Sequence, residues 1–134
     1  MTKYLLDTNI CIYFLKGQFE LGARIGDIGK ERCLISEITV AELKFGAENS
    51  QKKDANRKVV DAFISHFAVL PIYTCLDIYA KEKARLRKRG IVIDDFDLLI
   101  GSTAISNDLT LVTNNEKHFK QMHVIEVENW ALRQ

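Results

Sequence analysis

Short apolar runs alternate with longer helical patterns along this chain. The apolar runs are rich in strand-forming residues and lie at residues 3–6, 33–35, 68–72, 110–113 and 124–127. The helical patterns cover residues 9–16, 19–28, 38–47, 54–67, 76–89, 96–106 and 117–122. Repeated alternation of this kind predicts an α/β fold, in which helices cover both faces of a central parallel β-sheet.

The length and composition predict one domain over residues 1–134. A content of 47% hydrophobic and 28% charged residues is typical of a globular protein. The longest apolar runs fall far short of the roughly 20 residues that a membrane crossing needs. The sequence does not show the pattern of a signal peptide, which is a basic start followed by an apolar stretch and a cleavage site with small residues. We therefore expect a cytoplasmic protein without a membrane partner.

The sequence lacks several well-known functional motifs. Cys11, Cys33 and Cys75 are widely spaced in apolar surroundings, so we expect buried free thiols rather than a zinc or redox site. There is no phosphate-binding P-loop and no glycine-rich dinucleotide fingerprint. The three histidines do not follow the helical i, i+4 spacing of a two-histidine zinc site. These absences leave the acidic residues as the main candidates.

Asp7 directly follows the first apolar run. In an open parallel sheet, ligands bind beside the carboxyl ends of the strands, which is where Asp7 would lie. A carboxylate near a core costs several kcal/mol unless it is paired, hydrogen-bonded or bound to a metal. Asp7 therefore either caps the following helix or is directed at a ligand.

Glu42 shares a predicted inward face with Ile38, Ala41 and Phe45, at i, i+3, i+4 and i+7 spacing. A glutamate on a core-facing stripe usually has a partner. The alternative is a side chain that extends from the edge of the stripe into solvent or pairs with a lysine.

Asp97 shares a stripe with Ile100, Gly101 and Ala104 in the same way. An aspartate in the first turn of a helix can also simply stabilise the helix dipole. Asp94 or Asp95 is placed to cap this helix.

The three acids suggest a metal site for phosphodiester chemistry. Asp7, Glu42 and Asp97 would repel one another if they lay together without a cation. Oxygen ligands alone favour Mg²⁺, with Mn²⁺ as a substitute, over zinc. Such an ion activates water and neutralises charge on a phosphate. We therefore predict a Mg²⁺-dependent hydrolase that acts on phosphodiester bonds.

A basic segment, KEKARLRKRG at residues 81–90, carries six of the 19 Lys and Arg residues. It is either a phosphate-facing patch or the solvated end of a helix whose dipole favours positive charge. We expect Thr74 and Asp77 to form a capping box at the start of this helix and Gly90 to end it. Ser36 is the expected cap of the helix that carries Glu42.

Four segments together resemble the PIN-domain ribonucleases, and specifically the VapC toxins of VapBC type II toxin–antitoxin modules. They are YLLDTNICIYFLKG, ISEITVAELKFGA, DDFDLLIGSTAIS and LTLVTNNEKHF, and the resemblance covers essentially the whole chain. It implies a three-layer α/β/α domain in which Asp7, Glu42 and Asp97 bind the catalytic Mg²⁺ or Mn²⁺. Thr8 and Asn9 match the family's hydroxyl and amide beside the first acid.

The resemblance has one departure. Many relatives carry a fourth acid two residues after the threonine of the last motif, and here Asn115 stands two residues after Thr113. An amide orients water but carries no charge, which disfavours a second metal ion unless Asp95 compensates.

The resemblance also implies an RNA substrate and protein partners. Structured RNA such as initiator tRNA would be cut. From its charge pattern, we expect the basic segment to contact this RNA through Lys83, Arg85, Arg87 and Lys88. A VapB antitoxin would cover the acidic groove, operator DNA would be bound only through the antitoxin, and the chain would form a homodimer. The alternatives are a structure-specific DNA nuclease with the same chemistry and a non-catalytic PIN scaffold in a regulatory complex.

Overall fold

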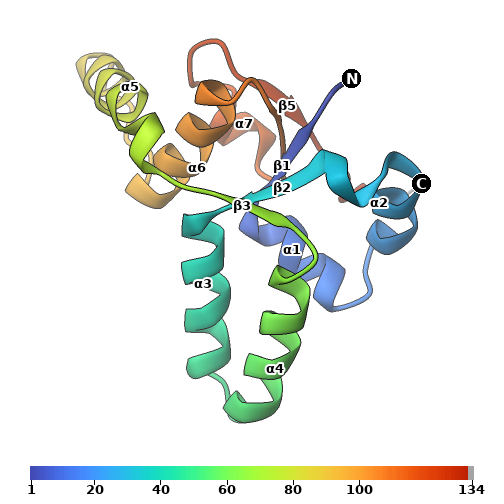
Figure 1. Cartoon of the computed structure of the whole chain (residues 1–134). Helices are drawn as coiled ribbons and strands as arrows, with labels where there is room; N and C mark the ends of the chain where they lie inside the picture. The colour runs from blue at the N-terminus through green and yellow to red at the C-terminus, as the bar shows by residue number, and fades with distance from the viewer. Residues whose placement is uncertain (133–134) are drawn as a thin grey trace.

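The structure is a computed structural model that describes residues 1–132, and a five-stranded sheet lies at its centre (Figure 1). The strands are β1 (Tyr4–Leu6), β2 (Cys33–Ser36), β3 (Ala68–Leu70), β4 (Thr110–Val112) and β5 (Glu126–Glu128). Their order in the sheet is β3-β2-β1-β4-β5, and every neighbouring pair is parallel. The predicted parallel α/β fold is therefore confirmed.

Seven α-helices and two short 3₁₀ turns connect the described strands. The helices are α1 (Thr8–Leu15), α2 (Leu21–Ile28), α3 (Glu37–Glu48), α4 (Lys53–Ile64), α5 (Leu76–Lys88), α6 (Asp95–Ser106) and α7 (Glu116–Phe119). The turns are η1 (Lys30–Arg32) and η2 (Tyr73–Cys75). Figure 1 shows α3 and α4 as a neighbouring pair that extends away from the sheet, with α5, α6 and α7 on the other side.

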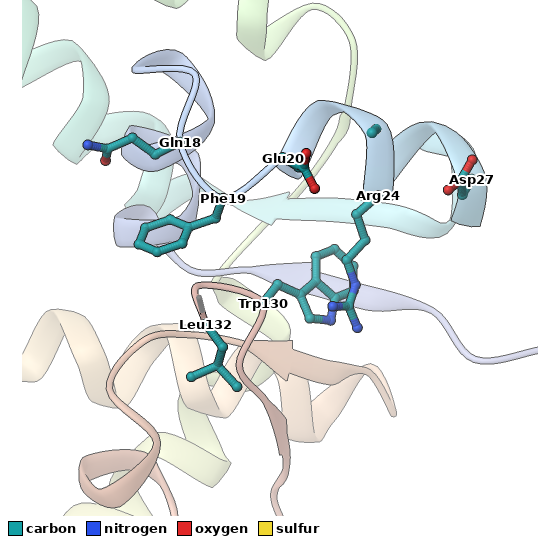
Figure 2. A pocket seen from close by; sticks show the side chains of 8 residues that line it. Gln18, Phe19, Glu20, Arg24, Asp27, Trp130 and Leu132 are labelled. Carbon is teal, nitrogen blue, oxygen red and sulfur yellow. The ribbon is translucent and has the colours of Figure 1, made fainter. Parts of the chain in front are cut away.

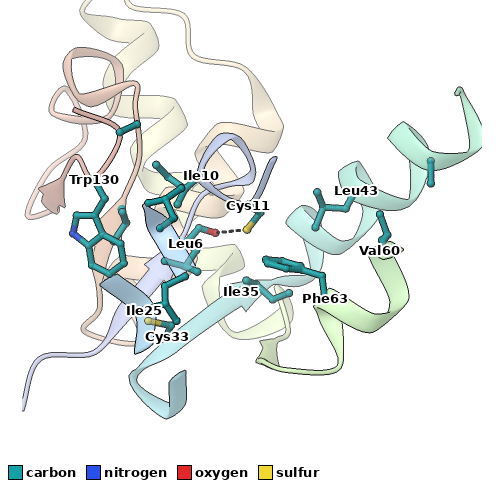
Figure 3. Packing of buried hydrophobic residues seen from close by; sticks show 14 residues of the cluster. Leu6, Ile10, Cys11, Ile25, Cys33, Ile35, Leu43, Val60, Phe63 and Trp130 are labelled. Atoms are coloured by element: carbon teal, nitrogen blue, oxygen red, sulfur yellow. Dashed lines mark hydrogen bonds between the residues drawn. The ribbon is translucent and has the colours of Figure 1, made fainter. Parts of the chain in front are cut away.

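Two hydrophobic cores lie on opposite faces of the sheet, because successive strand residues point to opposite sides. Leu6 belongs to the core formed with α1 to α4, where Ile10, Ile35 and Phe63 also pack (Figure 3). Leu5 belongs to the core formed with α5, α6 and α7. The three cysteines are buried and free, as predicted.

Two predicted strands are shorter or shifted. The third strand ends at Leu70 because Pro71 has no N–H to donate to the sheet. The fifth strand begins at Glu126 rather than at residue 124, since Val124 adopts a left-handed backbone conformation with φ 64°. In addition, α4 ends at Ile64, and the backbone of residues 65–67 closes in turns instead of continuing the helix.

The predicted inward face of α3 is wrong. Ala41 is exposed and Phe45 is 68% exposed, although Ile38 is buried as expected. The residues of this helix that pack against the core are Ile38, Thr39, Leu43 and Ala47, and of these only Ile38 belongs to the predicted face. Glu42 therefore lies at the border of the buried face and is half-buried.

The predicted caps are confirmed in part. Ser36 accepts a hydrogen bond from the Ile38 N–H at 3.0 Å, and Asp94 accepts one from the Phe96 N–H at 3.1 Å. The capping box at Thr74 and Asp77 is wrong, because η2 leads directly into α5 and Cys75 occupies the cap position without a side-chain bond.

Glycine at position 90 follows α5 with φ +73°, as expected at a helix end. Over residues 1–132, none of the helices combines the length and the apolar character that crossing a bilayer requires.

Candidate active site

Asp7 and Thr113 meet at the carboxyl edge of the sheet. They follow β1 and β4, which pair in parallel with Leu6 beside Val112, and the Asp7 N–H extends this pairing by donating to the Val112 carbonyl at 2.9 Å. The Asp7 carboxylate accepts from the Thr8 N–H at 2.8 Å and from the Thr113 hydroxyl at 2.7 Å. Asp7 therefore caps α1 and is also held in one orientation from the neighbouring strand.

Among residues 1–132, no basic side chain forms a salt bridge with Asp7. Its side chain is 4% exposed, and burial raises its pKa to about 6 although the Thr113 and Thr8 hydrogen bonds act in the opposite direction. The charged neighbours that shift this pKa are both acids, Asp97 and Glu42, and both raise it. A buried carboxylate in this setting is stabilised by a bound cation.

Thr8 connects Glu42 to the start of α1. The Thr8 hydroxyl donates to Glu42 Oε1 at 2.7 Å and lies 3.0 Å from the Thr39 hydroxyl, which belongs to the buried face of α3. Burial raises the pKa of Glu42, the Thr8 hydrogen bond lowers it, and the charge of Asp97 raises it again. The second acid is thus fixed beside the first.

Asp97 enters from the first turn of α6. Its stripe partners Ile100, Gly101 and Ala104 are buried, which confirms the predicted face of this helix. Burial is the main cause that raises the pKa of Asp97, and His118, whose Nε2 lies 3.2 Å from Asp97 Oδ2, lowers it.

The three acids therefore influence one another electrostatically across one edge of the sheet. They do not form a preassembled ligand cluster: among residues 1–132, no group of three His, Cys, Asp or Glu side chains is arranged to hold a metal ion. Mg²⁺ keeps several waters and binds proteins through one or two carboxylates, so carboxylates that share a region without converging on one point fit such an ion.

The predicted supporting residues gather around Thr113. Its hydroxyl accepts from the Asn115 N–H at 3.0 Å and lies 3.5 Å from Asn9 Nδ2. The Asn9 side-chain oxygen accepts from the Asn114 N–H at 3.3 Å. This hydrogen-bond network joins the start of α1 to the segment after β4, and the Asn115 side chain lies at the exposed rim.

Asp95 is engaged elsewhere. Its Oδ1 accepts from Lys83 Nζ at 2.7 Å and from the Tyr79 hydroxyl at 2.8 Å, and the Lys83 hydrogen bond holds its pKa below the usual range. Asp95 therefore faces α5, and the hypothesis that it compensates for the missing fourth acid finds no support in this geometry.

The basic helix α5 divides into two parts. Lys83 is bound to Asp95, while Arg85 donates to Glu82 and to the Gln121 carbonyl, both at 2.8 Å. Arg87 and Lys88 are exposed. Two of the four predicted RNA-binding side chains thus hold the fold together, and RNA contact stays a prediction that is strongest for Arg87 and Lys88.

Sequence reasoning missed Thr39, Asp94 and His118. Thr39 stands three residues before Glu42, a spacing that places both on one side of a helix and could have identified it. Asp94, expected only as a cap, also raises the pKa values of Glu42 and Asp97. His118 reaches Asp97 from α7 across the fold, for which the sequence contains no local signal.

A surface pocket of about 670 Å³ lies away from this site (Figure 2). Its lining comes from the loop before α2, from α2 itself and from the C-terminal segment, with Arg24 stacked 4.8 Å from the centre of the Trp130 ring. None of the three acids belongs to the lining described for it. The acids therefore lie outside this pocket.

Comparison with known proteins gives one consistent result. The family model for the PIN domain matches residues 4–124. Ribonuclease VapC2 of Rickettsia felis is 37% identical over 135 residues, which cover 95% of this chain and 97% of the relative. The tRNA(fMet)-specific endonuclease VapC of Salmonella typhimurium is 36% identical over 132 residues, or 98% of this chain and 100% of the relative.

Solved structures agree with the sequence relatives. VapBC2 from Rickettsia felis, bound to a DNA fragment from its promoter, contains a chain that matches with a TM-score of 0.90 and 35% identity, over 96% of this chain and 99% of that one. DNA-bound VapBC from Salmonella typhimurium matches with a TM-score of 0.91 and 34% identity, over 97% of this chain and 99% of the matched chain.

Proposed function

The chain belongs to the PIN-domain family and, within it, to the VapC ribonucleases, and on this premise we propose that it is a toxin that hydrolyses RNA phosphodiester bonds. The observation that carries the proposal is Asp7, a buried carboxylate whose charged neighbours are Glu42 and Asp97 and whose pKa is raised to about 6. A site that concentrates negative charge in this way requires a cation before it can approach RNA.

We propose that this cation is Mg²⁺, with Mn²⁺ as a substitute, and that Asp7, Glu42 and Asp97 hold it. PIN-domain ribonucleases generally use a divalent metal. The donor set consists of carboxylate oxygens, which suit a hard cation, and their separation leaves room for waters between some of them and the ion. When bound, such an ion lowers the pKa of a coordinated water and neutralises charge on the phosphate.

The chain's own contribution is positioning. Thr113 and the Thr8 N–H fix both oxygens of Asp7, and the Thr8 hydroxyl fixes Glu42, so little side-chain freedom is left to lose when the ion and the RNA bind. The amides of Asn9 and Asn115 lie next to this network and can donate hydrogen bonds to a phosphate oxygen. Arg87 and Lys88 provide exposed positive charge for the RNA backbone.

For the substrate we propose tRNA, and initiator tRNA in particular, because one relative of nearly the same length is a tRNA(fMet)-specific endonuclease. For the partners we propose a VapB antitoxin that covers the acidic site, a homodimer of this chain, and contact with operator DNA through the antitoxin alone. Solved VapBC complexes of relatives with DNA support this assignment. We also propose that the protein acts in the cytoplasm and that residues 1–134 form a single PIN domain.

A cleavage assay on purified, antitoxin-free protein tests the proposal. Initiator tRNA, an elongator tRNA and a DNA flap of equal concentration are incubated with Mg²⁺, and the product ends are mapped. We expect one or a few cuts in initiator tRNA, intact DNA, and no cuts with Asp7→Asn protein of the same fold. Preferential cutting of the flap would reassign the enzyme to DNA, and equal cutting by Asp7→Asn protein would refute the metal site.

A further inference from the structure

The segment around α7 is seated directly on α6. A Cβ atom at Gly101 would lie 2.4 Å from Met122 Sδ and 3.4 Å from Phe119 Cδ1, so any larger residue at this position would force the Met122 side chain to move. Phe119 and Met122 are both buried. The position of α7 relative to α6 is therefore set by close packing.

A second anchor joins the end of this segment to α5. Glu82, which is 7% exposed, accepts from the His123 N–H at 2.8 Å and from Arg85 at 2.8 and 3.1 Å. Arg85 in turn donates to the Gln121 carbonyl at 2.8 Å. The segment that carries His118 is thus fixed by packing on one side and by a charged hydrogen-bond network on the other.

This placement brings His118 onto Asp97. Asp97 precedes Gly101 by four residues and so lies on the same face of α6, one turn closer to the helix start. His118 Nε2 lies 3.2 Å from Asp97 Oδ2. Within the described residues this nitrogen is shielded from solvent and makes no well-aligned hydrogen bond, which leaves the Asp97 carboxylate as its ionic neighbour.

We propose that His118 is a positioning residue: its shielded Nε2, which lies 3.2 Å from Asp97 Oδ2, completes a hydrogen bond to that carboxylate when the divalent metal ion binds and so orients the carboxylate toward the ion. This inference rests on the proposed function, and it adds His118 as a residue that acts on the metal ion through the ligand Asp97. Carboxylates that bind metals are commonly oriented by a further hydrogen-bond donor, and loss of that donor typically costs 10- to 100-fold in metal affinity. Asn115 carries no charge at the fourth-acid position, and His118 Nε2 is a nitrogen donor within reach of Asp97 Oδ2.

Calorimetric titration with Mn²⁺ tests the proposal on the complete chain. We expect His118→Ala to weaken the Mn²⁺ Kd by about 10- to 100-fold. His118→Gln should restore much of the affinity, because its side-chain amide supplies an N–H donor of similar reach. His66→Ala is the matched control, since His66 is exposed and contacts Lys30 instead of an acid, and its Kd should equal that of the parent protein.

Two further readouts separate positioning from other roles. At limiting Mn²⁺ the His118→Ala protein should cut RNA slowly, and saturating Mn²⁺ should restore most of kcat without a large change in the KM for RNA. Pulsed electron paramagnetic resonance of bound Mn²⁺ should lack the strong ¹⁴N coupling of a directly bound imidazole. Strong coupling that disappears in His118→Gln would make His118 a ligand and overturn the positioning role.

The outcomes also distinguish this inference from the proposed function. If the parent protein binds Mn²⁺ and His118→Ala binds it equally well, the positioning role is wrong while the metal site stands. If the parent protein itself fails to bind Mn²⁺, the proposed function is wrong. If the His118→Ala protein does not fold, the test uses His118→Gln and His118→Leu proteins instead. The Mn²⁺ Kd of His118→Gln should then lie near that of the parent protein and well below that of His118→Leu, and equal Kd values for the two variants would refute the positioning role.

Discussion

Replacing Asp7 by asparagine should make the metal-free protein more stable at neutral pH. The rise of the Asp7 pKa from 3.8 to about 6 corresponds to an unfavourable free energy of about 3 kcal/mol for the ionised form, at 1.36 kcal/mol per pKa unit. The side chain is 4% exposed, so solvent screening reduces this figure little. Asparagine keeps the size of the side chain and removes the charge.

The direction of this stability change follows from proton linkage. The unfolded chain releases the Asp7 proton near pH 3.8, whereas the folded chain retains it until about pH 6. Folding is therefore favoured at low pH, and the stability of the parent protein declines through this window and stays reduced above it. The variant lacks this decline. Its stability relative to the parent should increase by about 2.4 kcal/mol between pH 4 and pH 7.

Urea unfolding followed by circular dichroism, with chelator present at pH 4, 5, 6 and 7, measures this difference. The asparagine NH₂ would face Thr113, whose hydroxyl now donates to Asp7, and this mismatch adds a cost that does not depend on pH. The test is therefore the change of the difference with pH. A difference that stays constant from pH 4 to pH 7 would refute the burial of an ionisable, unbalanced Asp7. Added Mg²⁺ should stabilise the parent protein and leave the variant unchanged.

Three further predictions concern packing, the acid network and the RNA surface. Gly101→Ala should destabilise the fold by ~1–3 kcal/mol in thermal unfolding, since its Cβ would displace the buried Met122 side chain, and an unchanged Tm would show that Met122 moves aside without cost and would contradict tight packing at this contact. Thr113→Val should raise the pKa of Asp7 further, because the hydrogen bond that lowers this pKa is lost. The Mn²⁺ affinity measured by calorimetry should therefore fall more at pH 7, where more of Asp7 is protonated, than at pH 8.5. An equal loss of affinity at both pH values would contradict a shift of the Asp7 pKa. Arg87→Ala combined with Lys88→Ala should reduce the salt dependence of RNA binding, making the slope of log Kobs against log salt shallower by about 1.4–1.8 if both side chains contact phosphates, and an unchanged slope would remove these two residues from the interface.

The fold could be predicted from the sequence because its strands and helices differ in local pattern. The α6 stripe was predicted correctly, since Ile100, Gly101 and Ala104 are all apolar or small and all buried. The α3 stripe was not, because Phe45 imitates a core residue although it is 68% exposed, and the polar Thr39 is fully buried. Burial of a hydroxyl or exposure of a phenyl ring depends on neighbours that local periodicity does not reveal.

The candidate site likewise combines features that the local sequence predicts with features that depend on long-range contacts. Asp7 could be placed at a strand end, and its proximity to Glu42 and Asp97 was suggested by their helix faces and by the family resemblance. The strand order that brings Thr113 beside Asp7 is a long-range property, as is the contact between His118 and Asp97. The engagement of Lys83 and Arg85 within the fold was likewise hidden, because a run of basic residues looks the same whether its charges are paired or free.

The dependence of RNA cleavage on the proposed metal site is measured by the cleavage rate as a function of free Mg²⁺. It is measured on one tRNA substrate with the parent protein and with Asp7→Asn, Glu42→Gln and Asp97→Asn proteins of confirmed fold. We expect a rate that rises to saturation with Mg²⁺ in the parent protein and vanishes under excess chelator. In each variant the rate should be lost, or restored only at much higher Mg²⁺. Cleavage that continues at full rate under excess chelator would contradict the proposed metal site.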